Sequence, residues 1–426
     1  MVFEVLCYYS SMPKDIIKQG ESVFGDYLKR AYHMDQPNSV ADPEYTKVLI
    51  NEFEDLNKSI QQIKTPKSRK DVLTNELKRI SKYYVTTLSE ELDPRTATPK
   101  EVIDRYFIKD EDIDFLKTWL KENREKVLEA NKRQLEFYSD SRRSRVHLGS
   151  KALRDQAESL MERHLDLLKR AVKEVLLLDE YNHVLGSFVI STDSVVSRSY
   201  ADKIARISMV GTGACVYMVD GKMFIDSVEL IGKFGHEVLG HCLNFVFTEK
   251  SDLPLFIKED YFAVTSASRE SVSGYFKNRL FDLLLTKPDS IKDFEMDEPF
   301  ERIFQRYKDT FLLDEYSLRL NMLGFWVMSN STMNGYNDQM KDLAEYSIEP
   351  KWVSFFLNRH RNDWNRSTGL LLPNIVSELR YAVESVTKIL NKKKPSDIKK
   401  FERAILTGAW SPDGFEEWVS LPACVE

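Results

Sequence analysis

The segment Gly235–Cys242 constrains this chain most, because it places two histidines and a glutamate inside an apolar run. It reads Gly-His-Glu-Val-Leu-Gly-His-Cys, so His236 and Glu237 are adjacent and His241 follows five residues after His236. In a regular α-helix, side chains five residues apart point roughly 140° away from each other. The two imidazoles can therefore meet only if the helix is locally widened. A π-bulge provides that widening, and Gly240 tolerates the distorted backbone.

Two histidines brought together beside a glutamate are typical of a metal site with a general base next to it. A catalytic zinc ion needs three protein ligands and an open position for water. We expect His236 and His241 to supply two of the ligands. Glu237 is then the general base that takes a proton from the attacking water and passes it to the leaving amine. The other interpretation is a buried histidine pair in a helix core.

The third ligand is expected from another helix, and Glu270 is the best candidate. Small residues lie one turn before it and one turn after it, which lets its helix approach another helix closely; they are Ser266, Ala267, Ser273 and Gly274. Glu259 and Asp260 are alternatives. Glu270 is also open to interpretation as a solvated helix residue.

The histidine spacing and the downstream glutamate resemble the gluzincin metallopeptidases. His-Glu-Val-Leu-Gly-His is similar to the His-Glu-Leu-Leu-Gly-His of dipeptidyl peptidase III and to the His-Glu-x-Gly-Thr-His of the tubulin-type tyrosine carboxypeptidases. Leu253-Pro254-Leu255-Phe256 and Glu270-Ser271-Val272-Ser273 occupy the places of the Pro-Leu segment and the Glu-Gly-Leu-Ala helix of the carboxypeptidases. The resemblance covers roughly residues 205–275 and, more weakly, 370–420, where the helices resemble those of helical oligopeptidase-like gluzincins.

This resemblance implies one Zn²⁺ ion held by His236, His241 and Glu270, with Glu237 as the base. It implies a zinc metallopeptidase that hydrolyses peptides or unstructured protein tails, as a carboxypeptidase or an oligopeptidase. The alternative is a non-catalytic helical binding or scaffold protein that retains a metal site. Candidates for stabilising the oxyanion are His360, Tyr336 and Tyr381. Candidates for binding a substrate carboxylate are Arg359, Arg361 and Arg380, each of which is also open to interpretation as surface charge.

The remaining pattern predicts a mainly α-helical protein with a small β-hairpin beside the metal-binding helix. Asp220-Gly221 joins two strand-like runs, 207–219 and 222–228, which is a strong hairpin signal. A polar residue followed by proline predicts helix starts at Asp42, Thr65 and Ser411. His164 lies on an apolar helical stripe, and we interpret it as a core residue. We expect an N-terminal helical region over 1–184 that forms one wall of a cleft, and a catalytic region over 185–426.

Length and composition limit the function further. The chain has 426 residues and a net charge of −6, which argues against a general nucleic-acid binder. Its four cysteines form no Cys-x-x-Cys pair, so we expect reduced thiols. No signal peptide and no run of 18 apolar residues is present, so we expect a cytoplasmic protein without membrane partners.

Overall fold

The computed structural model is mainly helical with small β-sheets, as the sequence predicts. It describes residues 15–34, 42–93, 110–140, 143–145, 151–175, 188–191, 205–208, 216–258, 263–286, 289, 299–330, 341, 343–348 and 402–421. The predicted boundary between residues 184 and 185 lies outside the described residues.

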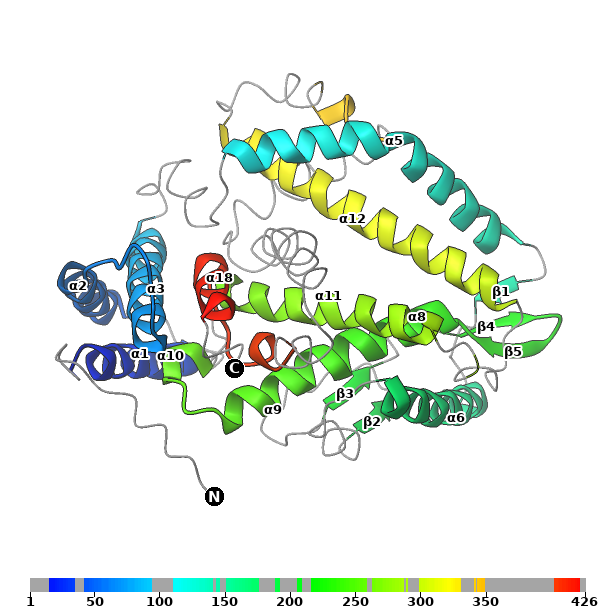
Figure 1. Ribbon diagram of the computed structural model, residues 1–426, viewed down its shortest axis with the longest axis horizontal. Coiled ribbons are helices and arrows are strands. Elements are labelled where there is room, and N and C mark those ends of the chain that lie inside the picture. Colours follow the sequence, from blue (N-terminus) through cyan, green and yellow to red (C-terminus); the bar gives the residue numbers. More distant parts are fainter. Residues whose placement is uncertain are drawn as a thin grey trace.

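Seventeen elements follow one another along the described chain, and most of them are helices (Figure 1). In order they are α1 (Asp15–Met34), α2 (Pro43–Ser59), α3 (Arg69–Leu92), α5 (Asp110–Ser139), β1 (Arg143–Arg145), α6 (Lys151–Val175), β2 (Phe188–Ser191), β3 (Ala205–Ser208), β4 (Val216–Val219), β5 (Lys222–Ile225), α8 (Ser227–Lys233), the π-helix η2 (Phe234–Cys242), α9 (Leu243–Lys250), α10 (Leu255–Lys258), α11 (Ala263–Thr286), α12 (Phe300–Asn330) and α18 (Pro412–Ser420).

Local sequence determines where several helices begin. The side chain of Asp42 accepts a hydrogen bond from the backbone N–H of Glu44 at the start of α2, and Ser411 caps α18 in the same way. The start predicted at Thr65 is wrong, because α3 begins after Ser68. Ser68 and Asp71 form a reciprocal capping box there, which satisfies two backbone donors and outcompetes the upstream proline signal.

The predicted hairpin is present and is part of a larger sheet. Asp220 and Gly221 have φ angles of 49° and 82°, the left-handed pair that a two-residue hairpin turn of type I′ requires. β4 pairs antiparallel with β5 on one side and with β1 on the other. A separate parallel pair joins β2 and β3. β1, only three residues long, carries too little sequence pattern to be predicted.

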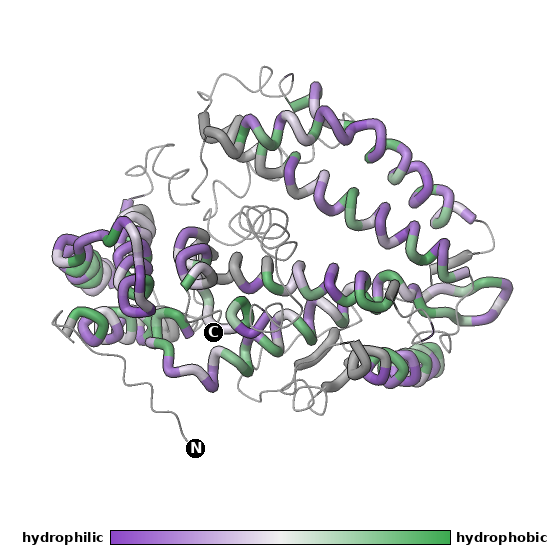
Figure 2. Tube along the Cα trace, viewed as in Figure 1, coloured by the Kyte–Doolittle hydropathy of each residue, from purple (hydrophilic) through white to green (hydrophobic). Residues whose placement is uncertain are grey.

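The helices form groups around one central run. α8, η2 and α9 follow each other without a break from Ser227 to Lys250, and this run packs along α11. In Figure 1, α1, α2 and α3 lie at one end of the run with α10, whereas α5 and α12 pack against each other above α11. Figure 2 shows that α5 is hydrophilic along most of its length. No helix in the described part of the chain is long and apolar enough to cross a membrane.

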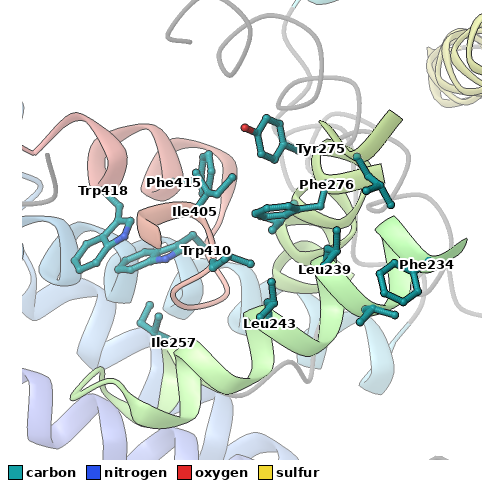
Figure 3. Close-up of a cluster of buried hydrophobic side chains, with 14 of the residues drawn as sticks. Phe234, Leu239, Leu243, Ile257, Tyr275, Phe276, Ile405, Trp410, Phe415 and Trp418 are labelled. Carbon is teal, nitrogen blue, oxygen red and sulfur yellow. The ribbon is translucent and has the colours of Figure 1, made fainter. Parts of the chain in front are cut away.

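The C-terminal segment fixes the central run from one side. Figure 3 shows a buried apolar cluster drawn from the central run, α10, α11 and the C-terminal segment, with the labelled residues Phe234, Leu239, Leu243, Ile257, Tyr275, Phe276, Ile405, Trp410, Phe415 and Trp418. The side-chain amide of Asn244 in α9 donates to the carbonyl oxygens of Leu406 at 2.9 Å and Gly408 at 3.2 Å. The helical run that carries the two histidines is therefore held by apolar packing and by hydrogen bonds from the Asn244 side chain to backbone carbonyls.

His164 is a core residue, as the sequence predicts. Its side chain is fully buried, and its Nδ1 lies 2.8 Å from the carbonyl oxygen of Leu160 within α6. A ring satisfied inside its own helix needs no metal to account for its burial.

Candidate functional site

The histidine motif lies in a π-helix, as its five-residue spacing requires. η2 covers nine residues, Phe234–Cys242, so the widening extends well beyond a single bulge at Gly240. At its end, the backbone N–H of Leu243 donates to the carbonyl of Val238, five residues earlier. Residues five apart therefore lie above each other along the axis, whereas in an α-helix they would diverge.

The consequence is that His236 and His241 become neighbours. Their ring centroids are 4.9 Å apart and the rings meet edge to face at 83°. Both side chains are half-buried, and Glu237 beside them is exposed. Two imidazoles in contact on one side of a helix fit the ligand pair of a zinc site, since imidazole nitrogen is a preferred zinc ligand.

η2 lies unusually close to α11, and two glycines make this possible. A Cβ atom added to Gly240 would lie 2.3 Å from the Cα of Ser273, and one added to Gly235 would lie 2.7 Å from the Cα of Lys277. Any side chain at either glycine would overlap the backbone of α11. The expectation that Gly274 helps the approach is wrong, because a Cβ there would meet nothing within 4 Å.

Glu270 occupies a suitable place on α11. It lies three residues before Ser273 and seven before Lys277, so the three positions share the helix face that packs against η2. The side chain of Glu270 lies outside the part of the chain that the structure describes, as do Glu259 and Asp260. Among the described side chains, no group of three His, Cys, Asp or Glu residues is close enough to hold a metal. The third ligand therefore stays a prediction.

A pocket of about 290 Å³ adjoins the motif, and sequence reasoning missed it. His236 and Glu237 line it from η2, Phe281 from α11, and Tyr307 and Phe311 from α12. Phe281 and Tyr307 stack with ring centroids 3.6 Å apart, and burial raises the pKa of Tyr307. The tyrosine therefore keeps its proton and contributes a neutral, largely apolar wall.

A buried ion pair closes one part of the pocket wall. Arg306 of α12 donates to Asp226 at 2.7 Å, and the guanidinium carbon of Arg306 lies 3.5 Å from the ring centroid of Phe137. Asp226 also caps α8 by accepting from the backbone N–H of Val228 at 3.1 Å. Burial, and then the Asp226 carboxylate, raise the pKa of Tyr138, which also lines the pocket.

Sequence reasoning overlooked both partners of this ion pair. An aspartate directly before the apolar run of α8 is an N-cap signal, so Asp226 could have been found. Arg306 lies 80 residues away in an amphipathic helix, and no local pattern marks its partner.

Two further ion pairs lie at the pocket. Lys277 of α11 contacts Asp314 of α12 at 3.1 Å, and Lys233 contacts Glu229 one turn earlier in α8 at 3.2 Å. The Cε atom of Lys277 passes 3.5 Å from the Cβ position of Gly232, so the lysine side chain runs along α8.

The residues suggested for oxyanion stabilisation and carboxylate binding all lie outside the described residues and stay predictions: His360, Tyr336, Tyr381, Arg359, Arg361 and Arg380. The basic groups that line the described pocket come instead from α8–η2, α11 and α12.

Comparisons of this chain with protein-family models, with curated proteins and with solved structures found no match.

Proposed function

We propose that this chain is a zinc-dependent metallopeptidase, acting as a carboxypeptidase or an oligopeptidase on peptides or unstructured protein tails. The observation that carries the proposal is the contact between His236 and His241 in η2, with Glu237 exposed at the adjoining pocket. His236 and His241 would hold the ion together with Glu270. Zinc bound there would supply Lewis-acid activation of a water molecule and of the substrate carbonyl.

Glu237 is the residue suited to move the proton. It follows His236 directly, lines the pocket and is solvent-exposed, so its carboxylate reaches water and substrate alike. It would accept a proton from the attacking water and donate it to the nitrogen of the leaving amine. A purely structural metal site has no need for a carboxylate beside its ligand, which favours an enzyme over a scaffold.

The pocket supports a peptide substrate in two ways. Its volume of about 290 Å³ is at the lower end of the range for small-molecule sites and suits one or two amino-acid residues. Its wall combines the stacked Phe281 and Tyr307 with charged groups, a mixture that suits a peptide, which is itself amphipathic.

The test combines zinc analysis with peptide cleavage by the full chain. The wild-type protein should hold about one zinc per chain and cleave members of a broad peptide mixture, with the products identified by mass spectrometry. Glu237→Gln keeps the shape of the side chain but removes the base. It should retain zinc and lose at least about a hundredfold in cleavage rate, the size of a general-base effect.

Glu249→Gln is the matched control, because Glu249 is an exposed glutamate at the end of α9, away from the pocket. It should leave both zinc content and cleavage unchanged. A protein that holds zinc but cleaves no peptide, with or without Glu237, would support the scaffold alternative. A protein that binds no zinc would refute the proposal outright.

A further inference from the structure

The pocket beside Glu237 contains an ion pair whose two partners are anchored very differently. Lys277 and Asp314 approach to 3.1 Å across the pocket, from α11 and α12. The lysine side chain is 27% exposed, whereas the aspartate side chain is 54% exposed. One partner is thus held within the protein, and the other stands largely in water.

The backbone and the stem of Lys277 are both fixed. Its Cα lies against Gly235, the residue before His236, and its Cε passes over Gly232. Lys277 therefore lines the same pocket as His236 and Glu237. Asp314 is on the exposed side of α12, and an exposed ion pair contributes little to stability. A competing carboxylate can therefore replace Asp314 at little cost, whereas Lys277 stays in place.

The other two cations of the pocket wall already have carboxylate partners. Arg306 is already paired with the buried Asp226, and Lys233 with Glu229, whose side chains are comparably exposed. When Asp314 turns to solvent, the pocket wall keeps two charges outside these ion pairs, the ammonium of Lys277 and the carboxylate of Glu237. The ammonium of Lys277 then offers an anionic group a place to bind.

We infer that Lys277 is a carboxylate-binding residue of this pocket, and that a substrate carboxylate displaces Asp314 from it. Because successive Cα atoms of a peptide are 3.8 Å apart, that carboxylate lies within one or two residues of the bond that Glu237 helps to cleave. It belongs either to a C-terminal residue or to an Asp or Glu side chain. The inference rests on the proposed function for the peptide substrate, but binding alone can test it.

Binding is measured by calorimetry with the full-length Glu237→Gln protein, which prevents turnover. Four short N-acetylated peptides share one alanine-rich sequence. One has a free C-terminal carboxylate, and the other three are C-terminal amides that carry alanine, glutamate or lysine at the same internal position. Comparing the free acid with the glutamate-containing amide identifies the source of the carboxylate.

Lys277→Gln should weaken binding of the carboxylate-bearing peptides by about tenfold or more and change the others by less than about twofold, since it removes a charge-assisted contact. Asp314→Asn should strengthen binding of the same peptides severalfold, because it removes the competing carboxylate. Lys308→Gln is the matched control: Lys308 is an exposed lysine of α12 that lies over Phe304 and does not line the pocket. Thermal unfolding of each variant verifies that it is folded.

Three results overturn the inference. They are an equal loss for all four peptides in Lys277→Gln, no gain for any carboxylate-bearing peptide in Asp314→Asn, and no binding of any carboxylate-bearing peptide at millimolar concentration. If the variants change peptide binding as expected but the wild-type protein cleaves no peptide, the proposed function fails and Lys277 remains a carboxylate-binding residue. If the wild-type protein cleaves peptides but the variants do not change binding as expected, only the role of Lys277 is refuted.

Discussion

Gly240 of the π-helix lies directly against Ser273 of α11, so closely that an added Cβ would be 2.3 Å from the Cα of Ser273. This contact positions the histidine helix against the helix that carries Glu270. The glycine thus has two roles, because it tolerates the widened helix and it lets two backbones approach. Ser273 itself is buried, and its Oγ has no hydrogen-bond partner among the described residues.

Gly240→Ala should destabilise the protein, because its methyl group would overlap the backbone of α11. We expect a loss of about 1–3 kcal/mol in the free energy of unfolding, typical of overpacking. Gly274→Ala is the matched control, since a Cβ there meets nothing within 4 Å in the interior of α11. It should stabilise the helix by up to about 1 kcal/mol. Urea unfolding measures both, and an equal effect of the two substitutions would contradict the close approach.

Removal of the metal should lower the thermal unfolding midpoint of the wild-type protein if zinc is bound as proposed. A ligand that binds only the folded state at about a hundred times its Kd stabilises by roughly 3 kcal/mol. In His241→Ala and Glu270→Ala, a chelator should no longer shift the midpoint. His164→Gln should be less stable yet keep the full shift, because His164 is satisfied within α6. A full shift in Glu270→Ala would exclude that residue as a ligand.

Asp226→Asn tests the buried ion pair at the pocket. The asparagine oxygen still caps α8, so the substitution removes the charge that Arg306 faces. Breaking a buried pair by removing one partner costs about 3–5 kcal/mol, and we expect a loss in this range. Asp252→Asn is the control, because Asp252 pairs with Arg69 at the exposed surface. It should change the unfolding free energy by less than about 1 kcal/mol. Comparable losses would show that the Asp226 pair is not effectively buried.

Glu76 should make stability depend on pH. Its side chain is fully buried between α3 and α18, and it accepts from the Ser411 hydroxyl at 2.6 Å and from Arg79 at 3.2 Å. Burial raises its pKa above the usual 4.5, with Arg79 and Ser411 opposing the shift. The folded state then binds more protons than the unfolded state. The stability that Glu76 contributes is therefore complete below pH 4.5, and it is lost as the pH rises through the pKa of Glu76 in the folded state.

The measurement is the free energy of unfolding over a pH series for wild type and Glu76→Gln. In the variant, the free energy of unfolding should lack the decrease with pH that Glu76 causes above about pH 4.5 in wild type, because glutamine does not titrate. Glu249→Gln, at an exposed position, should follow the wild-type profile. A Glu76→Gln profile parallel to that of wild type would exclude Glu76 as the titrating group.

Local sequence was sufficient at the hairpin, at two of the three predicted helix starts and at the histidine motif, whereas the start predicted at Thr65 was wrong. Asp220 and Gly221 predict the hairpin turn because few residue pairs adopt two positive φ angles. Asp42 and Ser411 predict helix starts because their side chains satisfy backbone donors two or three residues away. The spacing of His236 and His241 even predicts a widened helix, since no regular helix brings residues five apart together.

Only the tertiary structure decided which side chains share the pocket. Asp226 meets Arg306 across 80 residues, and Lys277 meets Asp314 across 37. Gly240 of η2 lies in the close contact with α11, whereas Gly274 of α11 faces no neighbour, although both are glycines in helices. These outcomes depend on how whole helices pack, and many packings satisfy the same amphipathic pattern. Sequence therefore determined the local backbone of the histidine motif, and helix packing determined the pocket around Glu237.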